Sequence, residues 1–194
     1  MLLIHESAYV EDGATIGENT NIWHFAHVRK QAIIGKNCNV GKDVYIDINV
    51  KIGDNCKIQN FASLYHGLTV DDDVFIGPHV CFTNDLYPRS KVWNDEKVAK
   101  TVVEKGVSIG ANSTIVAGIT IGSHAMIGAG SVVTDDVVSF GLVYGNPARL
   151  KGFVCECSVK MQKKNVEKDK IVFECPTCGK TIEVKKSIVD EVKL

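Results

Sequence analysis

Residues 34–58 read IGKNCNVGKDVYIDINVKIGDNCKI, and an aliphatic residue stands at every sixth position of this stretch. The same spacing runs without interruption from Ile4 to Ile76 and returns from Ile109 to Val133. Glycine often follows the aliphatic residue directly, and a small or β-branched residue often stands four positions after it. A repeat this short and this regular predicts a solenoid.

Each six-residue unit has the pattern of a short strand followed by a turn. The aliphatic side chain points inward, and glycine relaxes the backbone at or near the corner. Three units then form a triangular coil of eighteen residues, and successive coils stack about 4.8 Å apart. Residues eighteen apart share a column, so we expect Cys38 and Cys56 to fill one interior slot as small core residues rather than to form a disulfide.

Over roughly residues 4–150 the pattern resembles the hexapeptide-repeat family, which folds as a left-handed parallel β-helix. This resemblance implies an all-β protein with a β-helix domain over residues 1–152, an inserted loop and a C-terminal extension over residues 153–194. An unrelated all-β sandwich is the alternative fold. Each buried aliphatic side chain is expected to stabilise the fold by about 1.5–3 kcal/mol.

The composition argues against several classes of protein. The chain has 194 residues, of which 45% are hydrophobic, and a net charge of -1. A globular protein that does not depend on nucleic acid or an anionic membrane is expected. No apolar run approaches the length of a membrane span, and the N-terminus lacks a secretory signal pattern. Seven cysteines make a poor disulfide framework, so a cytoplasmic location is expected.

The repeat is interrupted between Ile76 and Ile109, which are 33 residues apart rather than a multiple of six. We expect a loop over about residues 84–106 to leave the β-helix and return. A loop of this length in a compact domain is usually functional or disordered. Tyr87 and Trp93 predict that this loop is packed. Holding a neighbouring subunit is a second role, and it is compatible with the first.

The column rule places polar residues on the outside of the coils. Asn84 falls one coil above His66, and Tyr65 lies beside His66. His24 and His27 suggest a metal site, because zinc accepts imidazole ligands readily. Within one chain, however, no two histidines share a column in adjacent coils. A metal-dependent hydratase with ligands from two subunits therefore stays open as an alternative.

Two stretches resemble the acyl-transferring members of the hexapeptide-repeat family. They are IGANSTIVAGITIGSHAMIGAGSVVTDD at residues 109–136 and GNPARLKG at residues 145–152. The resemblance implies that coenzyme A lies in a groove along these coils. It also implies that Ala111 and Ala129, one coil apart in a column, offer backbone contacts to the pantetheine arm.

The same resemblance assigns Thr134 and Arg149 to the nucleotide end of coenzyme A. Arginine suits this place because its guanidinium can bind phosphate in a fork. One residue departs from the family pattern. Asp135 stands where lysine often follows the threonine, so a positive charge that would help to bind phosphate is missing there.

Longer blocks resemble one subgroup, the acetyltransferases that acylate the 3-amino group of nucleotide-linked sugars for bacterial surface polysaccharides. The blocks are IWHFAHVRKQAIIGKNCNVGKDVYI at residues 22–46, KIQNFASLY at residues 57–65 and FIGPHVCFTNDLYPRS at residues 75–90. The resemblance implies acetyl-CoA as co-substrate and a homotrimer with active sites between neighbouring β-helices. It decides neither between UDP and dTDP nor between a uronate and a 6-deoxy sugar.

Acetyl transfer to an amine needs a neutral nucleophile and a stabilised oxyanion. The leaving thiolate, with a pKa of about 8.5, can accept the proton itself. We expect Asn84 to orient the amine or its sugar and Asp85 to act as base or hydrogen-bond acceptor, with His66 as a second candidate base. The residues expected to bind sugar, carboxylate or pyrophosphate are His24, Arg29, Tyr65 and Arg89. For the two arginines, a surface or subunit contact is an equal alternative.

The hexapeptide pattern ends after Gly152. Cys155 and Cys157 form one pair and Cys175 and Cys178 form another, with seventeen residues between the pairs. This arrangement resembles a zinc ribbon, in which four thiolates close a tetrahedron and leave no position open for catalysis. The spacing CEC is tighter than the usual CxxC, so loose surface thiols are the alternative. A structural metal would help a segment too short to build a large core.

Two other functions remain alternatives to the amino-sugar reaction. One is acetylation of a different small acceptor, such as the hydroxyl of a sugar or an antibiotic. The other is a non-catalytic solenoid that binds partners through its C-terminal extension. The FTNDLYPRS block argues against the first, and the resemblance of the last coils to coenzyme A-binding coils argues against the second.

Overall fold

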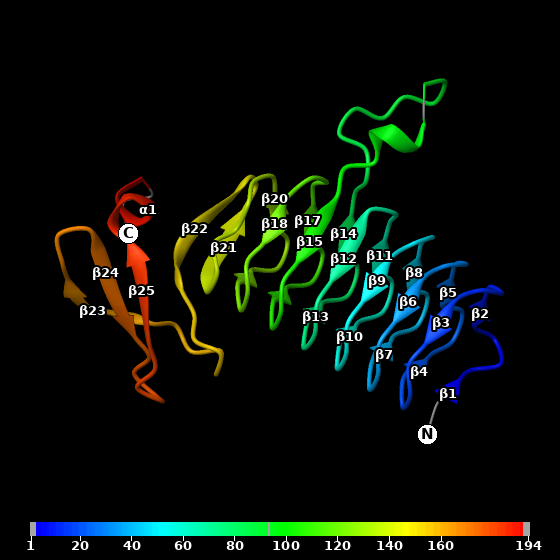
Figure 1. Ribbon diagram of the computed structural model, residues 1–194, viewed down its shortest axis with the longest axis horizontal. Coiled ribbons are helices and arrows are strands. Elements are labelled where there is room, and N and C mark those ends of the chain that lie inside the picture. The colour runs from blue at the N-terminus through cyan, green and yellow to red at the C-terminus, as the bar shows by residue number, and fades with distance from the viewer. Residues whose placement is uncertain (1–2, 93, 192–194) are drawn as a thin grey trace.

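The solenoid that the repeat predicts forms the main body of the protein. A computed structural model describes residues 3–92 and 94–191, and it shows three parallel sheets wound around one core (Figure 1). Most strands are two residues long and pair with the strands one coil before and one coil after. Ile58, for example, lies between Val40 and Ile76. The eighteen-residue coil is therefore confirmed.

The three sheets form the faces of a triangular prism. The first sheet contains β1 Leu3–Ile4, β4 Asn21–Ile22, β7 Asn39–Val40, β10 Lys57–Ile58, β13 Phe75–Ile76, β16 Ser108–Ile109, β19 Met126–Ile127, β21 Gly141–Gly145 and β22 Ala148–Phe153. The second sheet contains β2 Tyr9–Val10, β5 His27–Val28, β8 Tyr45–Ile46, β11 Ser63–Leu64, β14 Cys81–Phe82, β17 Thr114–Ile115 and β20 Val132–Val133. The third sheet contains β3 Thr15–Ile16, β6 Ile33–Ile34, β9 Lys51–Ile52, β12 Leu68–Val70, β15 Thr101–Val103 and β18 Thr120–Ile121.

The chain turns at three corners in every coil. The first corner joins the first sheet to the second, the second corner joins the second sheet to the third, and the third corner leads back to the first sheet. The last residue of most strands points inward, and Ile22, Ile46 and Ile58 are fully buried. Cys38 and Cys56 fill neighbouring interior slots at the third corner as buried free thiols, as predicted.

Close approach between coils explains the glycine that follows many inward residues. A Cβ on Gly35 would lie 2.3 Å from a carboxylate oxygen of Asp54 and 2.5 Å from the carbonyl oxygen of Gly53. Both of these atoms belong to the next coil. Two residues after Gly35, Asn37 has a φ of 56°, a left-handed conformation that asparagine tolerates better than most residues. Glycine and asparagine therefore recur in the repeat for backbone reasons.

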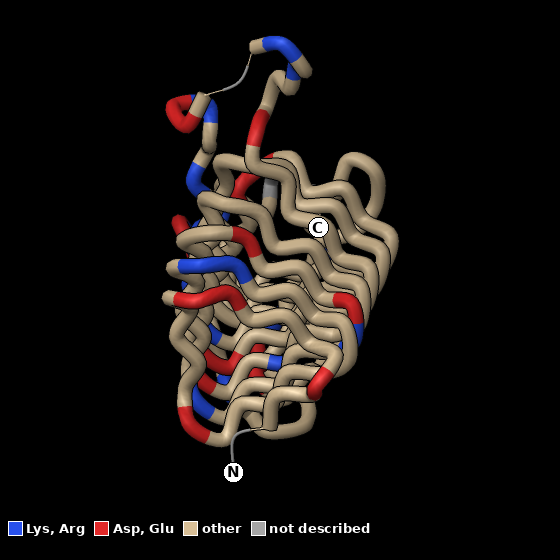
Figure 2. Tube along the Cα trace, turned by 90° about the vertical axis from the view of Figure 1, so that its right-hand side faces the viewer, with Lys and Arg blue, Asp and Glu red and all other residues tan. Residues whose placement is uncertain are grey.

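The inserted loop is shorter than predicted. It leaves the solenoid at the second corner after β14, and an isolated antiparallel bridge joins Asp85 to Val98 at its base. Thr101 already pairs with Leu68 of the previous coil, so residues 101–106 belong to the solenoid rather than to the loop. Viewed from the N-terminal end, the loop stands away from one corner of the stacked coils (Figure 2).

The loop does not pack against its own chain in the way the aromatic residues predicted. Tyr87 is 82% exposed, and Leu86 and Val92 are exposed as well. A short 3₁₀ helix, Asp95–Lys97, is its only helical turn within the described residues. Trp93 lies outside the described residues. Exposed apolar side chains on a projecting loop are typical of a surface that meets a partner.

The C-terminal extension forms a separate antiparallel sheet, β23 Gln162–Val166, β24 Lys170–Glu174 and β25 Thr181–Lys185, followed by α1 Lys186–Glu191. Its buried side chains, including Met161 and Phe173, join Phe153 in a small core. Leu150 and Phe140 of the solenoid end pack against this core. Among the described residues, no helix is long and apolar enough to cross a membrane.

The inward residues should dominate the stability of the solenoid. We expect Ile58→Ala to lower the free energy of unfolding by about 2–5 kcal/mol, because it leaves a cavity at a fully buried position. Chemical denaturation measures the change. The exposed neighbour Lys57 is the control, and Lys57→Ala should change stability by less than about 0.5 kcal/mol. Equal effects of the two substitutions would contradict the inward assignment.

Candidate active site

A column of alternating charge follows the second corner of the first coils. Glu11, Arg29 and Asp47 occupy equivalent positions in three successive coils. Arg29 Nε lies 3.1 Å from Glu11 Oε1, and Arg29 Nη1 lies 3.2 Å from Asp47 Oδ1. The guanidinium is therefore held between two carboxylates, one from the coil on each side.

His27 and Tyr45, on the outer face of the second sheet, support this column. His27 Nε2 lies 2.9 Å from Glu11 Oε1. The Tyr45 hydroxyl donates to Asp47 Oδ1 at 3.1 Å and accepts from Arg29 Nη1 at 3.4 Å. The His27 and Tyr45 rings pack edge to face with their centroids 5.5 Å apart. Together the five side chains form one connected polar network.

The network shifts the pKa values of its members. The Lys30 backbone N–H, followed by the His27 imidazole and then the guanidinium, lowers the pKa of Glu11 to about 2. The Tyr45 hydroxyl and the Glu11 carboxylate raise the pKa of Arg29. Burial raises the pKa of Tyr45. Glu11 and Arg29 consequently stay charged at neutral pH.

Asp47 connects the network to the next coil. It is buried, its Oδ1 accepts from the backbone N–H of Ile48 at 2.8 Å, and its Oδ2 accepts from the backbone N–H of His66 at 3.2 Å. The neighbouring Tyr65 ring packs against Tyr45, with centroids 5.5 Å apart. The charged column thereby fixes the backbone at His66 and the ring of Tyr65.

Asn84 follows in the next coil. Leu64 of β11 pairs with Phe82 of β14, and His66 and Asn84 each come two residues later. The register therefore places Asn84 one coil above His66, as the column rule predicts. Both side chains are half-buried, and the Asn84 carbonyl accepts from the Ala99 N–H where the loop returns.

Asp85 stands at the base of the inserted loop with one carboxylate oxygen unpaired. Its Oδ1 accepts from the Tyr87 backbone N–H at 2.7 Å. Its Oδ2 is buried and has no hydrogen-bond partner among the described residues. A buried acceptor without a donor costs about 1–3 kcal/mol, and more when it is charged. Such an atom in a native structure calls for an explanation, such as strain, a catalytic role or a bound water or ion.

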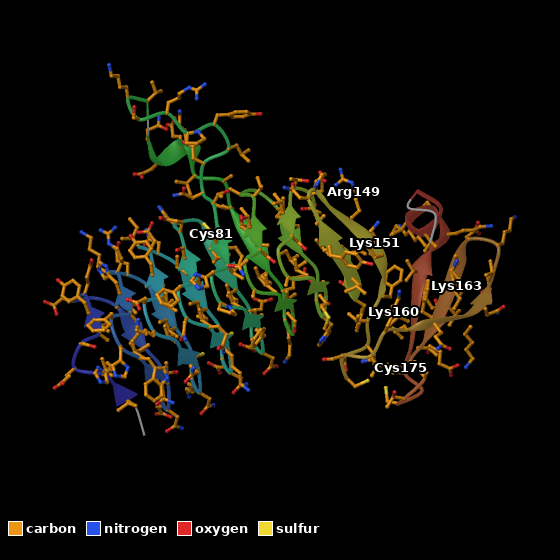
Figure 3. All side chains as sticks on the ribbon, turned by 180° about the vertical axis from the view of Figure 1, so that it is seen from behind. Cys81, Arg149, Lys151, Lys160, Lys163 and Cys175 are labelled. Carbon is orange, nitrogen blue, oxygen red and sulfur yellow. The ribbon has the colours of Figure 1, made fainter. Side chains whose placement is uncertain are left out.

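The second corner continues toward the C-terminal end of the solenoid. Thr134 and Asp135 stand two coils beyond Thr83 and Asn84, which is about 10 Å along the axis. The Thr134 hydroxyl donates to Asp135 Oδ2 at 2.8 Å, and Arg149 Nη1 lies 3.5 Å from the same oxygen. Figure 3 shows Arg149 on the same side of the solenoid as the inserted loop.

A cavity of about 300 Å³ opens beside Arg149. Asp135, Ala148 and Arg149 contribute to its lining, together with apolar side chains of the last coil. Ile188 of α1 lines it as well, so the C-terminal extension forms part of its wall. The cavity combines an apolar surface with one exposed guanidinium, but the carboxylates of Asp135 and Asp136 also line it, so an anionic group would have to replace Asp135 on Arg149.

Three of the predicted site residues lie elsewhere, at the first corner. His24 is exposed there, and its ring stacks on His5 with centroids 3.6 Å apart. Ala111 and Ala129 follow paired strands of the first sheet and so share a column, as predicted. The second sheet separates all three residues from Asp85. Arg149 lies in β22 of the first sheet, where it pairs with Tyr144, and its side chain reaches Asp135 at the second corner. One chain alone does not bring the two sets together.

The remaining sugar-binding candidates differ in availability. Arg29 is already neutralised by two carboxylates within the chain. Tyr65 is 38% exposed at the second corner. Arg89 is exposed in the inserted loop, where its Nη1 donates to the Pro88 carbonyl at 3.5 Å. The geometry therefore leaves Tyr65 and Arg89 available to a ligand and assigns Arg29 a positioning contact.

Sequence reasoning did not single out Glu11, Tyr45 and Asp47 as parts of the site. The signal was present, since Glu11, Arg29 and Asp47 are spaced by eighteen residues and alternate in charge. The same eighteen-residue spacing that places Asn84 over His66 also places these three residues in one outward column.

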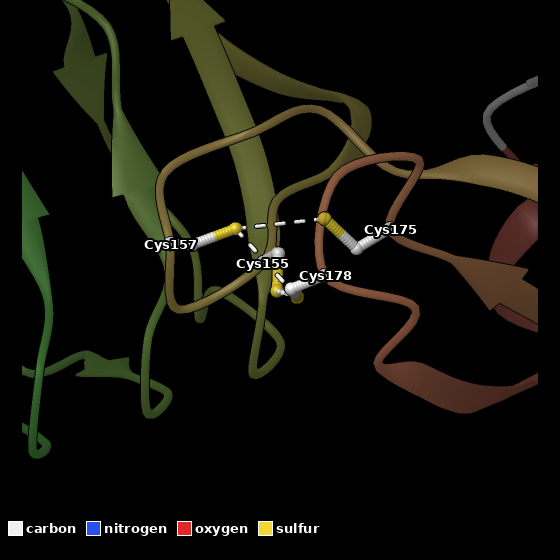
Figure 4. Close-up of side chains that lie close together, drawn as sticks. All are labelled: Cys155, Cys157, Cys175 and Cys178. Carbon is white, nitrogen blue, oxygen red and sulfur yellow. Dashed lines mark hydrogen bonds between the residues drawn. The ribbon is translucent and has the colours of Figure 1, made fainter.

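Four sulfur atoms gather at the boundary between the solenoid and the C-terminal extension (Figure 4). This cysteine cluster comprises Cys155, Cys157, Cys175 and Cys178, and all its sulfur atoms lie within 4.8 Å of one another. The two predicted pairs are therefore brought together. Backbone N–H groups of Cys178 and Thr177 lower the pKa of Cys175 to about 6.

A family model agrees with the architecture. The model described as bacterial transferase hexapeptide (six repeats) matches residues 13–47, 49–84 and 100–135, together more than half of the chain. The chain belongs to this family. The unmatched residues between the second and third segments are those of the inserted loop, so the family pattern stops where the structure leaves the solenoid.

One curated relative is similar over half of the chain. It is the dTDP-3-amino-3,6-dideoxy-alpha-D-galactopyranose 3-N-acetyltransferase of Aneurinibacillus thermoaerophilus, 46% identical over 97 residues. The match covers 50% of this chain and 47% of the relative, so the chain matches about half of the length of that protein.

Solved structures share the fold at lower identity. A GDP-perosamine N-acetyltransferase from Caulobacter crescentus, in complex with CoA and GDP-perosamine, has a TM-score of 0.53 at 21% identity, covering 78% of this chain and 57% of that one. The acetyltransferase domain of PglB from Neisseria gonorrhoeae, with acetyl coenzyme A, has a TM-score of 0.51 at 23% identity, covering 77% and 57%. These matches support the β-helix.

The lowered pKa of Glu11 predicts a pH-dependent contribution to stability. A depressed carboxyl pKa stabilises the folded state fully above the unfolded value of about 4.3, and the contribution disappears as pH falls toward about 2. We expect Glu11→Gln to lower the melting temperature at pH 6, with a gap to the unsubstituted protein that narrows below about pH 4.5.

Thermal melts between pH 6 and pH 3 measure this gap. Glu18→Gln is the control, because Glu18 is an exposed acidic residue outside the network. Its melting temperature should follow that of the unsubstituted protein at every pH. A gap for Glu11→Gln that stays constant down to pH 3 would contradict the charged role of Glu11.

Proposed function

We propose that the protein transfers the acetyl group of acetyl-CoA to the 3-amino group of a nucleotide-linked amino sugar, for the synthesis of a surface polysaccharide. The observation that carries the proposal is the unpaired buried Oδ2 of Asp85, which faces no donor within the described chain. Because this oxygen is buried, an amine would supply the missing N–H once the base of the inserted loop moves aside. The relative from Aneurinibacillus thermoaerophilus, a 3-N-acetyltransferase of a dTDP-amino sugar, supports this choice of acceptor.

The second corner offers the groups that the reaction needs. Asp85 Oδ2 accepts a hydrogen bond from the sugar amine and holds its lone pair toward the thioester carbonyl. Asn84 orients the amine or its sugar, and His66 is the second candidate base. The amine nitrogen forms a bond to the carbonyl carbon, and the bond from that carbon to sulfur breaks. The amine proton passes to Asp85, to His66 or to the departing thiolate.

Acetyl-CoA has a matching place at the same corner. We assign its nucleotide end to the cavity beside Arg149 and Thr134, where a phosphate would replace Asp135 on the fork of the guanidinium. About two coils, or roughly 10 Å, separate this end from Asn84 along the corner. A thioester extended along the corner would therefore reach the amine, while the inserted loop shields it on one side.

A homotrimer would unite the two sets of predicted site residues. His24, Ala111 and Ala129 lie at the first corner, whereas Asp85 lies at the second, which the Arg149 side chain reaches from the first sheet. If the first corner of one copy faces the second corner of its neighbour, the pantetheine arm contacts both alanine backbones. The exposed Tyr87 and Leu86 of the loop support such a partner contact.

Acetyl-CoA and reduced thiols also favour the cytoplasm as the site of action.

The direct test is release of the coenzyme A thiol, followed with a chromogenic thiol reagent. The purified chain is assayed with acetyl-CoA and either a dTDP-linked 3-amino-6-deoxy sugar or a UDP-linked 3-amino uronate. Thiol release that depends on one of these acceptors supports the proposal and identifies the nucleotide. Absence of release with both, together with no binding of acetyl-CoA in a thermal-shift assay, would contradict it.

Substitutions at the base of the inserted loop should reduce acetyl transfer more than substitutions further out in the loop. We expect the double substitution Asn84→Ala, Asp85→Ala to lower kcat/KM for the acceptor by about tenfold or more, because it removes the groups that orient the amine. The loop contains a matched pair, Asn94 and Asp95, which is exposed. The corresponding double alanine variant of this pair should retain full activity. Full activity in both variants would refute the assignment.

Arg149 should act on cofactor binding rather than on chemistry. We expect Arg149→Ala to raise the KM for acetyl-CoA by roughly tenfold while kcat changes little, because a phosphate contact is equal in the ground and transition states. Lys151 stands in the same strand and is also exposed, so Lys151→Ala is the matched control. Initial rates at varied acetyl-CoA decide the outcome, and equal KM values for the two variants would contradict it.

A further inference from the structure

The cysteine cluster has the shape of a closed four-sulfur site. Sγ atoms of Cys155 and Cys178 are 3.5 Å apart, as are those of Cys157 and Cys175, and Cys157 and Cys178 are 3.8 Å apart. Zinc–sulfur bonds of about 2.3 Å place the sulfurs of a tetrahedral site about 3.8 Å from one another. These three of the six edges are close to that value, the rest lie within 4.8 Å, and the three far exceed the S–S bond length of about 2.05 Å.

The cluster joins two parts of the chain that are distant in sequence. Cys155 and Cys157 directly follow β22, the last strand of the first sheet, whereas Cys175 and Cys178 lie in the turn between β24 and β25. Figure 4 shows the four side chains converging from these two turns. Cys155 and Cys175 are buried, and Cys157 and Cys178 are exposed. An ion could therefore enter from solvent and still be held on its inner side.

We propose that the cysteine cluster binds one Zn²⁺ through four thiolates and that this ion fastens the C-terminal sheet to the last coil of the solenoid. Four thiolates fill a tetrahedral zinc site and leave no position for water or substrate, so the ion is structural. The donor set consists only of soft thiolates, which disfavours calcium and magnesium.

The size of the extension explains why it needs a metal. Its core consists of a few side chains around Phe153 and Phe173, and every residue of β23 is exposed. A segment this small rarely folds on its hydrophobic core alone, and metals often supply the missing stability. The ion also keeps α1 over the last coil, where Ile188 forms part of the cavity wall beside Arg149.

Metal analysis of the full-length chain, purified without added metal or chelator, tests the site itself. Mass spectrometry of the acid-digested protein should find one zinc per chain. Cys175→Ser, Cys178→Ser should reduce the zinc content at least about tenfold, whereas Cys81→Ser should leave it unchanged. Cys81 is a free, half-buried cysteine outside the cluster, between Ser63 and Thr114 in the second sheet.

Hydrogen exchange tests the fastening. Removing the ion with a competing chelator should speed amide exchange in residues 155–191. The amides of the solenoid strands between residues 22 and 133 should stay protected. Added Zn²⁺ should restore the slow exchange. The proposal would be overturned if the purified chain held no metal, held iron in place of zinc, or contained two disulfides in the cluster. It would also be overturned if removal of the metal left exchange in residues 155–191 unchanged. None of these outcomes depends on acetyl-transfer activity.

Discussion

The eighteen-residue register between coils is the constraint on which the rest of the structure depends. Inward isoleucine and valine side chains can stack only if each coil repeats the path of the one below it. That requirement keeps glycine at positions such as Gly35, where a Cβ would collide with the next coil. It also forces outward side chains into columns about 4.8 Å apart. The charged column of Glu11, Arg29 and Asp47 is one result.

The same register links stability to chemistry at the second corner. Asp47 contacts the Arg29 guanidinium of the coil below and accepts from the His66 backbone N–H of the coil above. The charged column therefore positions the backbone of the candidate site. The departure of the inserted loop directly after Asn84 leaves Asp85 Oδ2 buried without a donor. The interruption of the repeat thus leaves one buried polar atom unpaired at the base of the loop.

Much of this arrangement could be predicted from the sequence, and the failures have physical reasons. The coil, the interior thiols and the position of Asn84 over His66 follow from spacing alone. The end of the loop was placed too late, although Val103 stands six residues before Ile109 and could have marked the return. The exposure of Tyr87 could not be foreseen, because aromatic residues indicate packing without saying whether the partner belongs to the same chain.

The separation of the site residues between two corners also follows from the spacing, since His24 and His66 are 42 residues apart, which is two coils and one six-residue unit. The central claim is that the second corner holds the sugar amine against Asp85. A crystal structure with CoA and a nucleotide-linked 3-amino sugar tests it most directly. The amine nitrogen should lie within hydrogen-bond distance of Asp85 Oδ2, with a phosphate of CoA on Arg149. A sugar bound elsewhere, with Asp85 Oδ2 still unpartnered, would contradict the claim.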